Sequence, residues 1–486
     1  MNIISPILAQ ARQQPTALAI CAPGAPQPFV SYGRLTTMMN NVACRAGAAG
    51  LKRGDIVAVF ADDAVLHLVL TLALTRLGIV TLSGGGYAIP PEIPVTANLV
   101  DAAAATAVAG TARSIPVDVQ WIMGDGTAPP ENPDTHDGAN AARIVLTSGT
   151  TGQPKGVALS HDMVARRVGA FTFAFGNIVP QCARCFVDVG LPSNYGFQWI
   201  VWLLSRGGAV FLRGSDAGET MQAFELYKVQ GMIAAPSGLA EFVELYEQSP
   251  AFSCPFGVIL AGGSLMWRSL ADRVRLRMCA HLVTSYGASE FSPIAVAPNH
   301  QICDIAGAVG FVCAGATVQA VDESDRPLAP GETGLIRVRG DFLVDGYVGT
   351  PPGSDQAFRG GWFYPGDIGA VTADKVLVIS GRQTAVLNVG GNKLGPETVE
   401  QAVLAFPGVA QAAAFGVENE LGILEVWTAI VARPGVEEAE LHRHLQKKLP
   451  HLFVPRRILR LPSLPQNAAG KLDRRRLAEM ARSGKP

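Results

Sequence analysis

Residues 147–156 combine glycines, hydroxyl side chains and a lysine in a way that suits phosphate binding. Gly149, Gly152 and Gly156 allow backbone conformations that a side chain would exclude, so that successive N–H groups can turn toward one anion. Further donors and a positive charge come from Thr147, Ser148, Thr150, Thr151 and Lys155. A flexible linker has no need of such a set, and the sequence therefore predicts a phosphate-binding loop. It differs from the GxxxxGKS/T loop, because Gly156 follows the lysine where that loop has a hydroxyl residue.

Other segments carry groups that suit a nucleotide. Tyr286, in the segment 285–290, could stack on a base, and Glu290 could hold Mg²⁺ beside the phosphates. Asp367, in the segment 362–367, could accept hydrogen bonds from both hydroxyls of a ribose. A solvated acid in a turn would explain either carboxylate taken alone, so the interpretation depends on their occurring together.

In their order along the chain, these segments resemble the motifs of the AMP-forming adenylating enzyme superfamily, which includes acyl-CoA synthetases, adenylation domains of peptide synthetases and luciferases. The resemblance covers nearly the whole chain. It implies that ATP and AMP are bound by Thr147, Ser148, Gly149, Thr150, Thr151, Gly152, Lys155, Gly262, Gly263, Ser285, Tyr286, Gly287, Ser289, Asp367, Arg382 and Lys471. It implies Glu290 as the metal ligand, and a catalytic set of Lys471, Glu290, Thr147 and Lys155.

The C-terminal segment 464–474 resembles the family motif that supplies the adenylation lysine, here Lys471. Its ammonium would stabilise charge between the acid and the α-phosphate, although a surface lysine in a basic tail is the simpler interpretation of the residue alone. Gly390 and Gly391 resemble the glycines that line the family's thiol tunnel. A rotation about residues 381–384 would withdraw Lys471 and admit the thiol. Gln383 and Thr384 depart from the family here, because the usual Asp or Lys of the hinge is missing.

The segment 191–199 resembles the part of the family that lies near the substrate carboxylate, with Asn194 near the place of an aromatic residue or histidine. The predicted acyl pocket consists of Asn194, Tyr195, Phe197, Trp199, Pro236, Ser237, Ala261 and Gly262. Core packing explains these aromatic residues equally well. No Asp stands where peptide synthetases pair with an α-amino group, which argues against amino acid substrates.

The order of apolar segments predicts an α/β fold. Strand and helix patterns alternate in the first part, as at 55–82, which is typical of βαβ units. Short strands with tight turns at 317–379 predict a small antiparallel sheet or barrel. We expect a large N-terminal domain of layered α/β subdomains with this β-barrel-like part at 1–381, and a small mobile α+β lid domain at 382–486 that carries the adenylation lysine.

The composition excludes several other classes. A net charge of -1 gives no reason to expect nucleic acid as a partner. The cysteines are scattered, and the one CxxC pair, Cys182 and Cys185, is a weak sign of a zinc or redox site, so a reducing cytoplasm is expected. The sequence shows neither a signal peptide nor an apolar run long enough to span a membrane. A monomer or homodimer is expected.

The predicted function is AMP-forming activation of a non-amino carboxylic acid, followed by thioester formation with coenzyme A. ATP, Mg²⁺ and coenzyme A are the expected cofactors. One alternative is a ligase that loads the acid onto the phosphopantetheine of an acyl carrier protein. A more distant alternative, motivated by the substituted hinge, is a nucleotide-binding homologue without catalytic activity.

Overall fold

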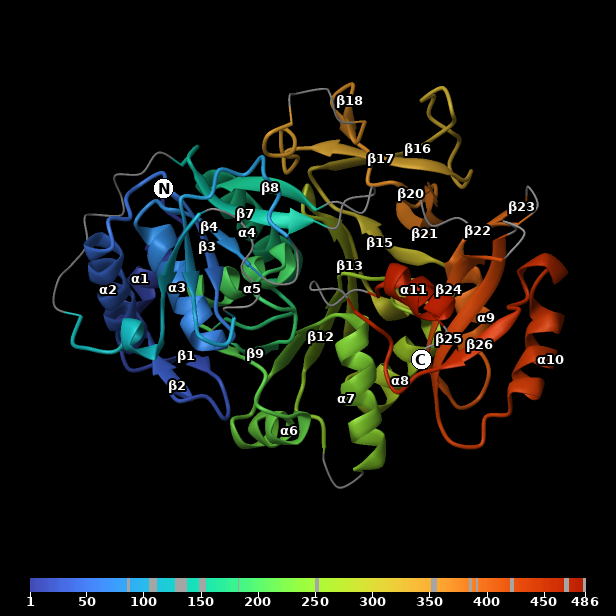
Figure 1. Cartoon of the computed structure of the whole chain (residues 1–486), viewed down its shortest axis with the longest axis horizontal. Helices are drawn as coiled ribbons and strands as arrows, with labels where there is room; N and C mark the ends of the chain where they lie inside the picture. The colour runs from blue at the N-terminus through green and yellow to red at the C-terminus, as the bar shows by residue number, and fades with distance from the viewer. Residues whose placement is uncertain are drawn as a thin grey trace.

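The structure is a computed structural model of the chain. It describes residues 1–84, 88–104, 112–126, 138–147, 154–181, 183–249, 253–350, 356–383, 387–389, 392–419, 424–466 and 472–483. Two large sheets, a set of helices between and around them, and a smaller C-terminal unit make up the described part (Figure 1).

The first sheet is built from βαβ units, as the sequence predicts. Its order is β6-β5-β3-β4-β7-β8, and all neighbouring strands are parallel except β7 and β8. The strands are β3 (Ile56–Phe60), β4 (Val80–Ser83), β5 (Ala97–Val100), β6 (Arg113–Pro116), β7 (Ala141–Thr147) and β8 (Lys155–Ser160). Strands β3 to β5 are almost entirely buried, because elements cover both faces of this parallel sheet.

The second sheet begins as a parallel sheet with crossover helices. Its parallel strands are β1 (Leu18–Cys21), β9 (Arg184–Val187), β10 (Ala209–Phe211), β11 (Gly231–Ala234), β12 (Val258–Gly262) and β13 (Leu282–Ala288), with β2 (Phe29–Ser31) at the edge. The crossover helices are α5 (Asn194–Ser205), α6 (Ala217–Leu226), α7 (Pro236–Gln248) and α8 (Arg268–Arg277).

Antiparallel strands continue the second sheet without a break, because the hairpin of β13 and β14 joins the two parts. These strands are β14 (Phe291–Pro298), β15 (Ala308–Val312), β16 (Ala316–Val321), β17 (Gly334–Gly340), β18 (Phe358–Arg359), β19 (Trp362–Phe363), β20 (Asp367–Val371) and β21 (Val376–Arg382). The antiparallel part predicted at 317–379 is present and is hydrogen-bonded to the parallel part.

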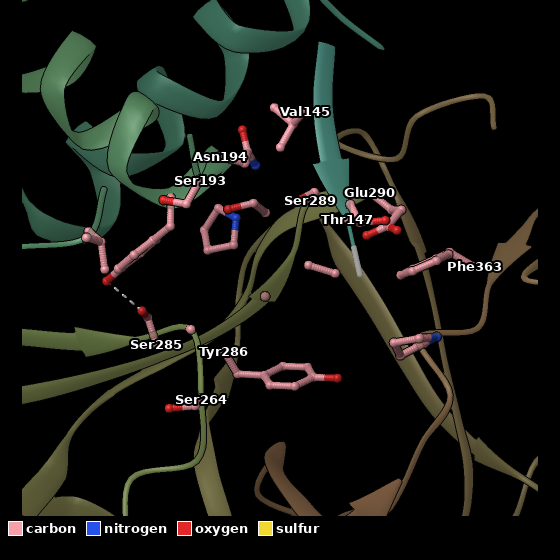
Figure 2. Close-up of a pocket in the computed structure, with 18 of the residues that line it drawn as sticks. Val145, Thr147, Ser193, Asn194, Ser264, Ser285, Tyr286, Ser289, Glu290 and Phe363 are labelled. Atoms are coloured by element: carbon pink, nitrogen blue, oxygen red, sulfur yellow. Dashed lines mark hydrogen bonds between the residues drawn. The ribbon is translucent and has the colours of Figure 1, made fainter. Parts of the chain in front are cut away.

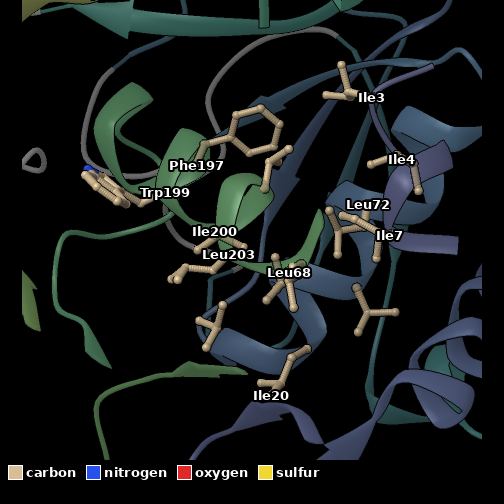
Figure 3. Packing of buried hydrophobic residues seen from close by; sticks show 14 of the residues in the cluster. Ile3, Ile4, Ile7, Ile20, Leu68, Leu72, Phe197, Trp199, Ile200 and Leu203 are labelled. Atoms are coloured by element: carbon tan, nitrogen blue, oxygen red, sulfur yellow. The ribbon is translucent and has the colours of Figure 1, made fainter. Parts of the chain in front are cut away.

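Helices fill the space between the two sheets. They are α1 (Ser5–Gln13), α2 (Tyr32–Ala48), α3 (Ala64–Arg76), α4 (His161–Phe175) and α5. Figure 3 shows side chains of α1, α3 and α5 meeting there, among them Ile7, Leu68, Leu72, Ile200 and Leu203, all buried. This packing holds α5 in place and so fixes the direction of its first turn.

The C-terminal unit has its own apolar core around Val399, Val403, Leu441 and Leu445. It contains β22 (Leu387–Val389), β23 (Asn392–Leu394), α9 (Pro396–Leu404), β24 (Val409–Glu418), β25 (Leu424–Ala432), α10 (Glu438–Lys448), β26 (Arg457–Arg460) and α11 (Arg474–Ser483). In Figure 1 it is the orange to red part beside α7 and α8.

Two further expectations concern the whole chain. Within the described ranges, none of the helices is both long enough and apolar enough to cross a membrane. The cysteines of the described residues are free thiols, Cys185 included, and Cys182 lies outside them.

Candidate active site

A pocket opens where β7, the β13–β14 hairpin and the first turn of α5 approach one another (Figure 2). Open α/β sheets bind ligands beyond the carboxyl ends of their strands, and β12 and β13 end here. The cavity measures about 190 Å³. Its walls divide into a polar end around Tyr286, Glu290 and Asp367, and an apolar end around Phe171 and Phe175.

Asp367 lies at the polar end with both carboxylate oxygens engaged. Tyr286 donates its hydroxyl to Oδ2, and Arg382 donates its Nε–H to Oδ1 at 3.0 Å. Asp367 and Arg382 face each other across β20 and β21, which brings the two residues together from separate motifs. Burial and the Asp367 carboxylate raise the pKa of Tyr286 well above its ordinary value, so the phenol stays neutral. A carboxylate has further lone pairs with which to accept hydrogen bonds from a diol.

Glu290 stands at the turn between β13 and β14, held by an arginine that sequence reasoning missed. Arg167 of α4 is fully buried and donates to the backbone oxygens of Ser289 at 2.9 Å, Glu290 at 3.0 Å and Phe342 at 2.7 Å. Burial lowers the pKa of Arg167 to about 9, which leaves it charged at neutral pH. The only signal in the sequence is an arginine on the buried side of an otherwise amphipathic helix.

Tyr347, which sequence reasoning also missed, connects two of the predicted catalytic residues. Its hydroxyl donates to Glu290 Oε1 at 2.8 Å, and Lys155 Nζ lies 4.6 Å from the centroid of its ring. The carboxylate of Glu290 is buried beside the pocket. Mg²⁺ in ATP sites binds one or two carboxylates together with substrate phosphates, so Glu290 fits the predicted metal without a second acid. Clusters of three His, Cys, Asp or Glu are absent from the described ranges.

The predicted phosphate loop follows β7 in the chain and precedes β8. Thr147 at the end of β7 pairs in register with Lys155 at the start of β8, and Thr147 lines the pocket. Gly156 lies inside β8, so its predicted role in a turn is wrong. Its Cβ would lie 2.7 Å from the Ile93 side chain, which makes close packing the reason for the glycine.

Several predicted residues lie outside the described residues. They are Ser148, Gly149, Thr150, Thr151 and Gly152 of the phosphate loop, Gly390 and Gly391 of the thiol tunnel, Thr384 of the hinge, and Lys471.

Tyr195 and Ser285 meet at the wall of the pocket. Their hydroxyl oxygens lie 3.0 Å apart, and Ser285 also donates to the backbone oxygen of Ala261 at 3.3 Å. A Cβ on Gly262 would lie 2.7 Å from Ser285 Oγ and 2.9 Å from Tyr195 Cζ. Gly262 therefore allows the two side chains to meet, while Gly263, with a φ of +90°, lines the pocket directly.

The predicted acyl residues divide into pocket and core. Asn194 and Tyr195 line the pocket, whereas Phe197, Trp199 and Pro236 are buried behind its walls. The prediction that Phe197 and Trp199 line the pocket is wrong, because both rings pack against neighbouring side chains. Phe197 lies 4.5 Å from the Arg143 guanidinium, and Trp199 packs on the two aromatic rings that do line the pocket. Those rings are Phe171 and Phe175 of α4, which sequence reasoning missed.

A second cavity, of about 410 Å³, adjoins the first. Val189, Gly190, Ser193 and Ala235 line both, and Ser237 lines only the second. Ala261 and Gly262 line neither; they pack behind Ser285 and Tyr195. Arg213 crosses the second cavity to Asp188 at 2.8 Å and to Glu241 at 2.8 Å. Its lining also includes Gln466 of the C-terminal unit, which forms a β-bridge with Leu472.

Comparison with known proteins identifies the family. The AMP-binding enzyme family matches residues 89–348, and the AMP-binding enzyme C-terminal domain matches residues 398–471. The chain belongs to the AMP-binding enzyme family. It is thus a member of the AMP-forming adenylating superfamily that the sequence motifs indicate.

Relatives of this AMP-binding enzyme match along most of their length. The feruloyl-CoA synthase of an Amycolatopsis species is 26% identical, over 95% of this chain and 96% of the relative. The 2-succinylbenzoate–CoA ligase of Geobacillus kaustophilus is 28% identical, over 90% of each chain. Among solved structures, o-succinylbenzoate CoA synthetase from Bacillus subtilis with its acyl-adenylate superposes with a TM-score of 0.82, at 20% identity and 97% coverage of both chains. The ATP-bound MatB of Rhodopseudomonas palustris gives 0.81 at 22% identity, covering 100% of this chain and 99% of MatB.

The described part of this AMP-binding enzyme brings polar and apolar groups into one cavity. The buried carboxylates of Asp367 and Glu290 line it together with Thr147, the last residue of β7. The aromatic residues Phe171 and Phe175 line the same cavity.

Proposed function

We propose that this enzyme is an AMP-forming acyl-CoA synthetase for a non-amino carboxylic acid. The observation that carries the proposal is a single cavity in which the ribose acceptor Asp367, the metal ligand Glu290 and the phosphate residue Thr147 share walls with an apolar end. The relatives named above, which are CoA synthases and ligases of aromatic acids, support the same reaction class.

The first step would join the acid to AMP. A carboxylate oxygen attacks the α-phosphorus of ATP, the bond to the β-phosphate oxygen breaks, and pyrophosphate leaves. Thr147 and Lys155, with the loop between them, would bind the phosphates, and Lys471 would stabilise the charge that develops between acid and phosphate. Mg²⁺, held by Glu290, would neutralise phosphate charge when bound.

The second step would transfer the acyl group to the thiol of coenzyme A, with release of AMP. The second cavity adjoins the acyl end and includes Gln466 of the C-terminal unit, so both predicted domains border the reacting space. We infer that residues 381–384 are the hinge, and that the domains divide at 381/382. Gly390 and Gly391 would line the thiol path after rotation. The cytoplasmic location and the monomeric or dimeric state stay predictions.

The acyl end suits a substrate whose acyl part carries no charge. Its described lining residues are apolar or neutral, and the acids of the neighbouring cavity, Asp188 and Glu241, are paired with Arg213. An α-ammonium group placed there would lose its hydration without gaining a free carboxylate. This supports an alkyl or aryl acid substrate over an amino acid.

The test is acid-dependent release of pyrophosphate from ATP and Mg²⁺ across alkyl, aryl, dicarboxylic and amino acids, with and without coenzyme A. We expect one acid class to release pyrophosphate and to yield a coenzyme A thioester detectable by mass. Pyrophosphate release without a thioester would indicate a carrier protein as the acceptor. The match to a fatty acid–acyl-carrier-protein ligase of Mycobacterium marinum is the reason to include this outcome. A folded enzyme that releases no pyrophosphate with any acid would contradict the proposal.

A further inference from the structure

Arg143 of β7 is a buried charge whose described hydrogen bonds go to neutral groups. Its side chain is fully buried, and burial lowers its pKa to about 9, so the guanidinium stays charged at neutral pH. One terminal nitrogen donates both to Ser83 Oγ at 2.7 Å and to the backbone oxygen of Leu191 at 2.8 Å. Burial of a charge without an opposite charge beside it is costly, and arginine is rarely buried in this way. The arrangement therefore suggests a role beyond filling the core.

Arg143 lies on the same face of β7 as two residues that line the pocket. Successive side chains of a strand alternate between its two faces, so Arg143, Val145 and Thr147 point to one side. Val145 and Thr147 line the pocket. In Figure 2, Val145 lies on the same side of the pocket as Ser193 and Asn194. Arg143 continues this row behind the pocket wall, on a strand that is held by pairing with β4 and β8.

The bond to Leu191 reaches a segment that belongs to neither a helix nor a strand. Residues 188–193 connect β9 to α5. Three of them line both cavities: Val189, Gly190 and Ser193. Ser193 N donates to Gly190 O at 3.0 Å, which closes a turn within the segment without attaching it to another element. The hydrogen bond from Arg143 attaches the middle of this segment to β7.

The second acceptor of Arg143 belongs to a separate chain of buried hydrogen bonds. Because Ser83 Oγ accepts from Arg143, its hydroxyl hydrogen can be donated to His67 Nε2, 2.8 Å away. His67 Nδ1 then carries the ring hydrogen and donates to the backbone oxygen of Ala61 at 3.2 Å. Burial and the charge of Arg143 lower the pKa of His67 to about 4, which keeps the ring neutral. Ser83 and His67 are not among the described residues that line either cavity, so a change there disturbs the core alone.

We propose that Arg143 is a positioning residue for acid activation, because it holds residues 188–193 at a fixed distance from Thr147, the residue at which β7 ends. The acid would bind against this segment and the phosphates beyond β7, so the hydrogen bond to Leu191 sets the distance between the reacting groups. The inference rests on the proposed function. Since Arg143 lines neither cavity, its loss should alter the use of the acid more than the use of ATP.

The test compares Arg143→Met with Ser83→Ala. Arg143→Met removes the donors and releases Leu191, whereas Ser83→Ala disturbs the same buried network and leaves the bond to Leu191 in place. Pyrophosphate release is measured with the best of benzoic, cinnamic, hexanoic and octanoic acids. In Arg143→Met we expect kcat/KM for the acid to fall at least about tenfold, and the KM for ATP to change by less than about threefold, because small displacements of reacting groups are costly. Both constants should stay within about threefold of the wild-type values in Ser83→Ala.

Hydrogen exchange of the unliganded enzyme measures the positioning without catalysis. The amides of residues 188–195 should exchange at least about tenfold faster in Arg143→Met than in the wild-type enzyme, and at the wild-type rate in Ser83→Ala. Arg143→Lys keeps the charge and N–H groups on a shorter side chain, so it should lie between the wild-type enzyme and Arg143→Met in both measurements. If Arg143→Met does not fold, Arg143→Lys replaces it in the comparison, and an unchanged kcat/KM for the acid in that variant overturns the inference.

The outcomes separate this inference from the proposed function. Wild-type enzyme that releases pyrophosphate, together with a folded Arg143→Met that loses the use of acid and ATP equally, overturns the inference and leaves the ligase reaction intact. Equal effects of Arg143→Met and Ser83→Ala, or unchanged exchange at residues 188–195, also overturn it, because Arg143 would then only stabilise the core. Wild-type enzyme that releases no pyrophosphate with any acid overturns the proposed function itself.

Discussion

Asp367 is the residue on which the proposed nucleotide recognition depends most directly. Its carboxylate holds a neutral phenol from Tyr286 and a guanidinium from Arg382, and the charge of Asp367 in turn raises the pKa of Arg382. The carboxylate is therefore fixed in orientation before any ribose arrives. Such an arrangement reduces the entropy lost when a ligand binds.

Replacing Asp367 by Asn should weaken ATP binding far more than acid binding. The amide keeps the shape but loses the charge that attracts Arg382 and strengthens hydrogen bonds to a diol. We expect the KM for ATP to rise about tenfold to a hundredfold, with the KM for the acid changed by less than about threefold. Steady-state kinetics with each substrate varied in turn measures both, and equal changes in the two constants would contradict this role.

Tyr347→Phe should weaken the response to Mg²⁺. The variant removes the hydrogen bond to Glu290 Oε1 but keeps the ring beneath Lys155. Partners of metal ligands commonly change metal affinity tenfold or more, so the Mg²⁺ concentration for half-maximal pyrophosphate release should rise about tenfold. Tyr347→Leu, which also removes the ring, should in addition raise the KM for ATP. A Tyr347→Phe enzyme with an unchanged Mg²⁺ requirement would remove Tyr347 from the metal site.

At the scale of elements, the site depends on the β13–β14 hairpin, whose position is fixed by contacts to its backbone. The β13–β14 turn carries Ser289 and Glu290, and Arg167 of α4 ties their backbone oxygens to that of Phe342. The other support is β12, which ends in Gly262 directly beneath Tyr195 and Ser285. Both supports act through backbone position and not through contact with a nucleotide.

Gly262→Ala tests the second support. The added methyl group would lie 2.7 Å from Ser285 Oγ and must displace it or Tyr195, which both line the pocket. We expect kcat/KM for the acid to fall at least about tenfold while the KM for ATP changes little. Gly257→Ala, just before the same strand, is the matched control, since its nearest neighbour would be 3.7 Å away. Equal losses in the two variants would show that the effect is general destabilisation.

For the whole molecule, the C-terminal unit is docked on α7 by a charged contact. Arg433 lies 3.0 Å from Glu247, and Glu247 also pairs with Arg273 at 2.9 Å. Hydrogen bonding by Arg273, with the charge of Arg433, holds the pKa of Glu247 below its ordinary value. A carboxylate whose pKa is lowered by such contacts contributes to stability at neutral pH. This contribution is lost as the pH falls below the ordinary pKa of a glutamate, about 4.3.

Glu247→Gln should therefore loosen the docking at neutral pH. We expect faster hydrogen exchange in α7 and in the strands next to Arg433, and a dependence on ionic strength that is smaller than in the wild-type enzyme. The wild-type enzyme should approach the exchange of the variant only when the pH falls below about 4. Glu440→Gln removes a pair within α10 and is the control, because that pair does not join the two parts. Unchanged exchange in Glu247→Gln would exclude this contact as a support of docking.

Local chemistry allowed the sequence to determine the family and the α/β class. A glycine loop, a Tyr–Glu segment and a ribose Asp need particular residue types at short spacing, and the match to the AMP-binding enzyme family confirms the interpretation. The roles assigned to individual site residues, among them Asp367, Glu290, Lys471 and the thiol-tunnel glycines, stay predictions.

Only the tertiary structure decided which aromatic and charged residues serve the pocket. Phe197 and Trp199 lie close to Asn194 in sequence, yet the packing of α5 between the sheets turns them into the core. Phe171, Phe175, Arg167 and Tyr347 reach the site from elements distant in sequence. Their types alone predict ordinary core or surface residues, because burial and partner choice are set by how the two sheets and the helices pack, and no local pattern carries that information.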